Sequence, residues 1–107
     1  MVREVETYQE LENLLQNIPK EQFVVLDCFA TWCGPCKAFS PFFDELSKEY
    51  GNVLFLKADV DKIDELTAEF KVRAMPTFIF FKNLTVIERI QGADQQKLVD
   101  YLTQISQ

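Results

Sequence analysis

The sequence contains no histidine among its 107 residues. Histidine is the usual general base, the commonest metal ligand and the side chain that most often changes charge near neutral pH. Acid–base chemistry in this protein must therefore use other groups. Three cysteines are too few for a disulfide-rich framework. A structural zinc site, which usually needs four cysteine or histidine ligands, is disfavoured for the same reason.

Positive charge is also scarce. Eleven Lys and Arg stand against 17 Asp and Glu, which gives a net charge of −6 and a pI near 4.6. Without a basic patch, binding to nucleic acid or to an anionic membrane is disfavoured. No stretch approaches the roughly 20 apolar residues of a membrane span, and the N-terminal residues form no apolar run of signal-peptide length. We therefore expect a cytoplasmic protein; a processed organellar protein would share these features.

The length and composition fit one globular domain covering residues 1–107. Hydrophobic residues make up 48% of the chain, and ten of them are Phe, which predicts a well-filled core. We find no internal repeat, low-complexity tract or linker, and we expect a monomer.

The hydrophobic pattern predicts strands and helices in the order β-α-β-α-β-α-β-β-α. Long connections between the first strands indicate parallel pairing, and the last two strands are expected to form a hairpin. The predicted fold class is α/β, with a mixed central sheet flanked by helices on both faces. The strands are expected at residues 2–6, 23–29, 53–58, 77–81 and 86–90. Four helices are expected: one after a capping box that begins with Thr7, one at 34–50, a short one capped by Asp61, and one that begins near Asp94. In the helix 34–50, Phe42 is expected in the buried stripe and Gly51 as the C-cap.

The most informative motif is the pair of cysteines in Trp32-Cys33-Gly34-Pro35-Cys36. Two thiols three positions apart can close a small disulfide ring and reopen it. The pair follows the apolar strand 23–29 and begins the helix 34–50. A Cys-x-x-Cys near a βαβ pattern indicates redox chemistry, and α/β sheets place their sites at the carboxyl ends of strands.

The position of the pair on the helix predicts different roles for the two thiols. The orphan N–H groups and partial positive charge of a helix N-terminus lower the pKa of a nearby thiol. Cys33 is therefore expected to attack a substrate disulfide as the thiolate. Cys36, one turn into the helix, is expected to be more buried and to resolve the mixed disulfide.

Asp27 is the only acidic residue in the apolar strand that leads to the motif. Burial disfavours its charged form and should raise its pKa, so that it can take a proton from Cys36 near neutral pH. The alternative is a buried polar group whose hydrogen bonds are satisfied and which has no role in the reaction.

Over essentially its whole length the chain resembles the thioredoxin family. The stretch from Ala30 to Lys37 matches the active-site segment of that family at every position. Asp27 matches the buried acid of the family, and Lys57 a lysine close to that acid. Met75-Pro76-Thr77 matches a segment with a cis-proline, and Gly92-Ala93 a segment of the substrate-facing rim.

The resemblance implies the thioredoxin fold and a protein-disulfide reductase, or electron carrier, in which Gly34 and Pro35 set a reducing poise. It implies no bound cofactor: electrons come from NADPH through a separate flavin reductase, thioredoxin reductase, and pass to oxidised client proteins. Base rates alone favour a trans bond before Pro76, and only the resemblance predicts cis. Substrates would bind to an apolar patch around Cys33, which comprises Trp32, Gly34, Pro35, Ala74, Met75, Pro76, Gly92 and Ala93. For Met75 the alternative is a side chain that only fills the core.

Other functions compatible with the same residues are a static disulfide, a thioredoxin-fold binding module or subunit, and an oxidase or isomerase. A ring this small would stabilise the fold weakly, and Pro35 disfavours the oxidase and isomerase. The binding module is distinguished by the substitution Cys33→Ser, which it would survive.

Two positions depart from the family pattern. The hairpin turn reads Lys82-Asn83-Leu84 where relatives usually have Gly third; because Leu tolerates positive φ poorly, we expect a different turn type. Cys28 replaces an apolar residue and should point to the face opposite Asp27. It is expected to be an inert buried thiol; the alternative is a regulatory or intermolecular disulfide.

Overall fold

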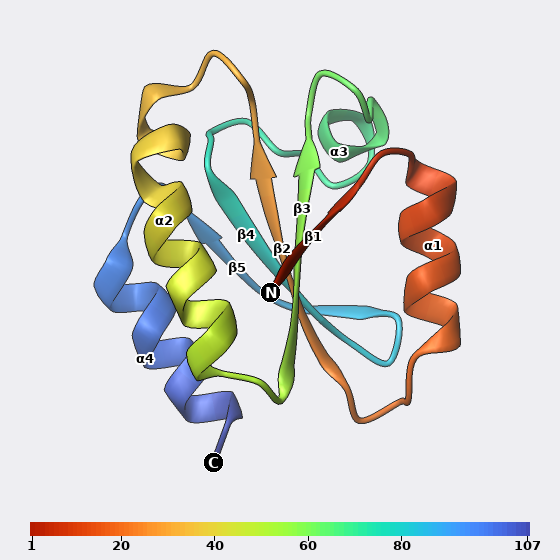
Figure 1. Cartoon of the computed structure of the whole chain (residues 1–107). Helices are drawn as coiled ribbons and strands as arrows, with labels where there is room; N and C mark the ends of the chain where they lie inside the picture. The colour runs from red at the N-terminus through yellow and green to blue at the C-terminus, as the bar shows by residue number, and fades with distance from the viewer.

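The computed structural model describes all residues from 1 to 107, and the order of its elements is the predicted one (Figure 1). The strand predicted at 23–29 has those bounds in the structure, and the other strands differ by one or two residues at their ends. The elements are β1 (Val2–Val5), α1 (Tyr8–Asn17), β2 (Phe23–Phe29), α2 (Gly34–Glu49), β3 (Val53–Asp59), α3 (Glu65–Ala68), β4 (Thr77–Lys82), β5 (Thr85–Gln91) and α4 (Gln95–Ile105).

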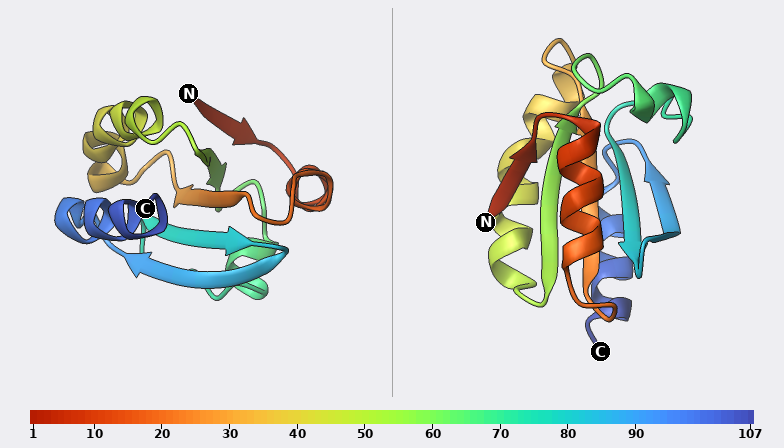
Figure 2. Two further views of the ribbon diagram at one scale, coloured as in Figure 1. Left: turned by 90° about the horizontal axis from the view of Figure 1, so that it is seen from below. Right: turned by 90° about the vertical axis from the view of Figure 1, so that its right-hand side faces the viewer.

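The five strands form one mixed sheet in the order β1-β3-β2-β4-β5. The pairs β1·β3 and β3·β2 are parallel, whereas β4 runs antiparallel to both β2 and β5. Figure 2 shows α2 and α4 on one side of this sheet and α1 on the other. The predicted mixed sheet with helices on both faces is confirmed, and β2 lies at its centre.

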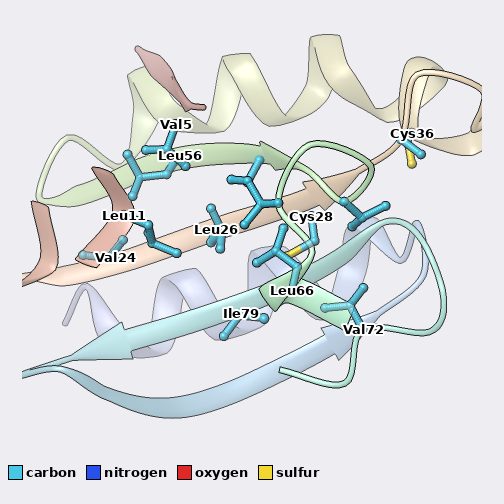
Figure 3. Packing of buried hydrophobic residues seen from close by; sticks show 14 of the residues in the cluster. Val5, Leu11, Val24, Leu26, Cys28, Cys36, Leu56, Leu66, Val72 and Ile79 are labelled. Carbon is cyan, nitrogen blue, oxygen red and sulfur yellow. The ribbon is translucent and has the colours of Figure 1, made fainter. Parts of the chain in front are cut away.

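The apolar residues separate into two clusters, one on each face of the sheet. One cluster joins alternate residues of β2 to Leu11 of α1 and Leu66 of α3; Figure 3 shows part of it. The other joins Val25 to side chains of α2 and α4, including Phe43 and Leu98. Strand β2 is covered on both faces, which explains why its sequence is almost entirely apolar. No helix in the structure has the length and apolar character needed to cross a membrane.

The cap of α1 agrees with the sequence prediction, and α4 begins where predicted, directly after Asp94. Thr7 Oγ1 accepts a hydrogen bond from the Glu10 N–H at 3.1 Å. Asp94 accepts one from the Lys97 N–H at 3.0 Å in the same way. Each side chain satisfies one of the amides that a helix start leaves without a partner.

The expected C-cap at Gly51 is wrong. Helix α2 ends at Glu49, and Tyr50 caps it by donating its N–H to the Leu46 carbonyl at 2.9 Å. The chain turns back through a second bond, from the Val53 N–H to the Tyr50 carbonyl. Because these two bonds complete the turn, Gly51 does not adopt positive φ.

Two further expectations about helices need correction. Asp61 does not cap the short helix: α3 begins after Asp64, whose side chain makes no capping bond. Asp61 accepts a hydrogen bond from Trp32 instead. Phe42 is only partly buried at the margin of its cluster, because the fully buried stripe of α2 runs through Phe39 and Phe43.

The expectation that Leu84 would force another turn type is also wrong. Lys82 pairs with Thr85, which leaves a two-residue loop with φ of 52° at Asn83 and 64° at Leu84. Positive φ at both loop residues is typical of the type I′ hairpin, whose twist matches the strands. Strand twist therefore prevails over the local preference of Leu84, at a cost of roughly 1 kcal/mol.

Candidate active site

The two cysteines of the motif lie where β2 passes into α2. They form a disulfide with a Cα–Cα distance of 5.3 Å, so the structure represents the oxidised protein. Cys33 is the N-cap of α2, and its Sγ accepts a hydrogen bond from the Cys36 N–H at 3.1 Å. This amide belongs to the first helical turn, whose partial positive charge stabilises an anionic sulfur.

The expected difference in burial is not seen for the whole residues, because Cys33 and Cys36 are both 5% exposed. Cys33 is covered by the segment that precedes β4, where its Sγ lies 3.7 Å from the Met75 carbonyl oxygen. What differs between the two sulfurs is their surroundings: Cys36 lines a pocket beneath the motif, and Cys33 does not.

This pocket brings three of the predicted residues together. It has a volume of about 210 Å³ and is lined by Cys36, Asp27 and Lys57. Asp27 and Lys57 are register partners on β2 and β3. Sequence reasoning missed Ser40 as a wall of this pocket; its spacing of four residues from Cys36 along a helix was the available signal.

Asp27 is 6% exposed, and its Oδ1 has no hydrogen-bond partner in the protein. Burial raises the pKa of this carboxyl from 3.8 to about 7, and the positive charge of Lys57 partly opposes the rise. The predicted shift is thus reproduced in direction and cause, and it places the titration of Asp27 near neutral pH.

The expected rim residues lie in the loop before α2 and its first turn, in the loop before β4, and in the loop after β5. The bond between Met75 and Pro76 is cis, as the family resemblance implied. Gly92, with φ of 88°, donates its N–H to the Pro76 carbonyl at 2.8 Å and so joins two of these loops. Met75 is half-buried and packs against the core, which makes it partly the core filler considered above. Ala74 and Ala93 are exposed beside them.

Trp32 contributes the largest exposed apolar side chain of this rim. It is 66% exposed, and its Nε1 donates a hydrogen bond to Asp61 Oδ2 at 2.9 Å. The contact with Asp61 was not foreseen, because the residues are 29 positions apart and nothing in the sequence pairs them. It fixes the indole beside the dithiol, next to the exposed Gly34 and Pro35.

The third cysteine lies apart from the site. Cys28 is fully buried as a free thiol, and Figure 3 draws it within the apolar cluster, with Cys36 near the margin of the view. Burial raises its pKa, and the charge of Asp27 adds to the rise. No group of three or more His, Cys, Asp or Glu side chains is arranged to hold a metal ion.

A disulfide at the N-terminus of a helix, beside a cis-proline and above a buried acid, defines a thiol–disulfide oxidoreductase with a Cys-x-x-Cys active site. The chain belongs to the thioredoxin family, whose model matches residues 3–104. It is 45% identical to the thioredoxin of Equus caballus and 42% identical to that of Homo sapiens, over 98 residues and 92% of each chain.

Solved structures agree with the sequence relatives. The thioredoxin of Fasciola hepatica is similar with a TM-score of 0.90 and 40% identity, covering 95% of this chain and 97% of that one. The thioredoxin of Schistosoma mansoni gives a TM-score of 0.90 and 42% identity, covering 96% and 94%.

The chain also matches part of a much longer protein. It is 40% identical over 103 residues to a peptide-N(4)-(N-acetyl-beta-glucosaminyl)asparagine amidase of Caenorhabditis elegans. The match covers 96% of this chain and 17% of the amidase, and the corresponding protein of Caenorhabditis briggsae is matched over 16% of its length.

Proposed function

We propose that this protein reduces disulfide bonds in other proteins and carries the electrons by means of its own dithiol. The observation that carries the proposal is the placement of Cys33 at a helix N-terminus and of Cys36 in one pocket with Asp27. This arrangement supplies a stabilised thiolate for the first step and a proton acceptor for the second.

The reaction has two exchange steps. The Cys33 thiolate attacks one sulfur of the client disulfide, a mixed disulfide forms, and the other client sulfur leaves as a thiolate. Cys36 then loses its proton and attacks Cys33 Sγ, so that the second client sulfur leaves and the Cys33–Cys36 disulfide forms. The client gains two electrons and the protein loses two. The oxidised structure is the product of this sequence.

Asp27 is the group we assign to take the proton of Cys36. A carboxyl with a pKa of about 7 is partly ionised at neutral pH and can both accept and release a proton. Lys57 holds that pKa below the value burial alone would set. Burial and Lys57 together therefore set the pKa of Asp27, while Gly34 and Pro35 set how readily the disulfide is reduced.

The exposed rim around Cys33 is proposed as the client surface. An apolar surface of low relief around a reactive sulfur selects an extended client segment by shape and not by charge. Of the residues predicted for it, Pro76 is buried and Met75 and Gly92 are half-buried, and the exposed ones are Trp32, Gly34, Pro35, Ala74 and Ala93.

Family membership supports the remaining parts of the proposal. Thioredoxins bind no cofactor and are reduced through thioredoxin reductase. We propose such a reductase, supplied with NADPH, as the electron donor and oxidised proteins as clients. We also propose that residues 1–107 act as one monomeric domain in the cytoplasm, where thiols are kept reduced.

The test is insulin reduction, followed by turbidity with dithiothreitol or a reductase as the electron source. Cys33→Ser is expected to abolish activity, and Asp27→Asn to slow it with a changed pH profile. Cys28→Ala is the matched control, because it removes a cysteine outside the site. Full activity of Cys33→Ser would overturn the proposal, and an unchanged pH profile of Asp27→Asn would remove the base assignment alone.

A further inference from the structure

The hairpin β4–β5 exposes several large apolar side chains that have no part in the proposed reaction. The exposed fractions are 60% for Leu84, 44% for Val86 and 40% for Ile87. Apart from Met1, the only other large apolar residue this exposed is Trp32, which belongs to the active site. Grouped apolar side chains on a surface mark sites of interaction.

Leu84 and Val86 form one side of a pocket of about 150 Å³. Tyr8 and Leu15 of α1 and the rings of Phe70 and Phe81 also line it. Phe70 packs edge-on against both neighbouring rings, with centroid distances of 6.2 Å to Tyr8 and 5.9 Å to Phe81. These six residues define the hairpin pocket, whose aromatic part is held in place by packing.

The β4–β5 turn, which bears Leu84, is far from the dithiol. Lys82, at the hairpin turn, pairs with Phe23 at the start of β2, whereas Cys33 follows the other end of that strand. A seven-residue strand separates them by roughly 20 Å. Figure 1 shows the β4–β5 turn and the β2–α2 connection at opposite ends of the sheet. The hairpin pocket shares no lining residue with the pocket beneath the dithiol, so the two are separate.

The margin of the hairpin pocket is acidic. Glu12 lines it beside Gln16, and Glu65 and Glu69 lie close enough to Tyr8 to affect its titration. Burial is the main reason that the pKa of Tyr8 is raised to about 12, and the hydrogen bond and charge of Glu69 follow.

Two cations of this region are held by main-chain oxygens, and a third, Lys82, lies over the Phe23 ring. Arg89 donates to the Phe70 carbonyl, and Lys71 donates to the Ala68 carbonyl at 3.0 Å. Neither residue lines the pocket. Glu12 is the only charged residue that lines the pocket, and a carboxylate at this position favours a cationic partner.

The backbone at Leu84 supports an outward role for its side chain. With φ of 64°, the position favours Gly, which would remove the steric penalty. The side chain is mostly exposed, so burial within the chain offsets little of that penalty. Residues in disfavoured conformations concentrate at functional sites, where another interaction compensates.

We propose that the hairpin pocket binds an apolar side chain of a partner protein, presented on a segment in which Lys or Arg flank that residue. The apolar side chain fills the space between Leu84 and Tyr8, and the flanking cations face Glu12 and Glu69. Pairing of the segment with the β5 edge is disfavoured, because the strand register shifts at Phe80/Phe81 and bulges disrupt edge pairing. A second copy of the chain is disfavoured by its net charge of −6.

The probe is a short labelled peptide of leucine and lysine, titrated into the oxidised protein and followed by fluorescence anisotropy and by amide NMR shifts. We expect shifts at the hairpin pocket and weaker binding at higher salt. Leu84→Gly should weaken binding about fivefold, because apolar contact area is lost. It should not unfold the protein, because Gly suits the turn. Glu12→Gln should reduce the salt dependence.

Ile87→Thr is the matched control: it removes an exposed apolar residue of the same hairpin that does not line the pocket, and it should leave affinity unchanged. Insulin reduction should be normal in all three variants. Equal affinity of wild type and Leu84→Gly would overturn the proposal. So would equal binding of a leucine–glutamate peptide, shifts confined to the active-site rim, or self-association that Val86→Thr abolishes.

Discussion

Replacing Asp27 by Asn is the most informative perturbation of this protein. The carboxyl is 6% exposed, lacks a protein partner at Oδ1 and has its pKa raised from 3.8 to about 7, chiefly by burial. Asn has nearly the same shape but no charge to bury. The variant therefore separates the free energy of burying the charge from the packing of the side chain.

The magnitude follows from proton linkage. Below pH 3.8 both the folded and the unfolded chain hold the proton. Between about pH 4 and 7 the unfolded chain releases it and the folded protein keeps it, so the free energy of unfolding falls as the pH rises. Each unit of pKa difference corresponds to about 1.4 kcal/mol, so that about 4 kcal/mol is lost by pH 8. Asp27→Asn should therefore be more stable than wild type by up to that amount at pH 8, and nearly equal at pH 4.

The assay is urea unfolding of both proteins in the oxidised form, at several pH values from 4 to 8. The difference in unfolding free energy should grow with pH and level off above about pH 7. Insulin reduction by Asp27→Asn should be slower despite the greater stability. A stability difference that does not change with pH would refute the raised pKa, whatever the activity.

Four further outcomes are expected. Lys57→Met removes the charge that lowers the pKa of Asp27, so the pH profile of insulin reduction should move to higher pH. Cys36→Ser should accumulate a mixed disulfide between Cys33 and the client, seen by mass on non-reducing gels. Leu84→Gly should raise the unfolding free energy by about 1 kcal/mol, measured by urea unfolding, because it relieves the positive φ. Cys28 should resist iodoacetamide until the protein is unfolded, because it is fully buried and burial raises its pKa; peptide mapping of the oxidised protein should show only the 33–36 bridge.

The element order could be read from the sequence because hydrophobic periodicity and caps are local signals. Thr7 caps α1 as predicted, α4 begins near Asp94 as predicted, and β2 has the predicted bounds. The error at the hairpin turn falls where a non-local constraint prevails over local preference. At Leu84 the twist of the paired strands imposes a positive φ that the residue type disfavours.

The site was predictable to the level of the residues but not of their contacts. Cys33, Cys36 and Asp27 follow from spacing and from a lone acid in an apolar strand. The equal exposure of the two cysteines was missed, because cover for Cys33 comes from Met75, 42 positions along the chain. The bond from Trp32 to Asp61 was missed for the same reason. Contacts between loops depend on the order of the strands in the sheet, and no local sequence pattern predicts that order.

Asp27 and Leu84 share a physical property that links the two proposals. Each is unfavourable for folding where it lies, the first through a buried carboxyl and the second through its backbone conformation. At each position a simple substitution, to Asn or to Gly, should increase stability. For Asp27 the compensating role is a proton acceptor beside Cys36. The compensating role proposed for Leu84 acts outward, because its side chain gains little from packing within the chain. Stabilising both positions in one protein should therefore affect two separable properties: Asp27→Asn the rate of disulfide reduction, and Leu84→Gly the affinity for the basic apolar peptide.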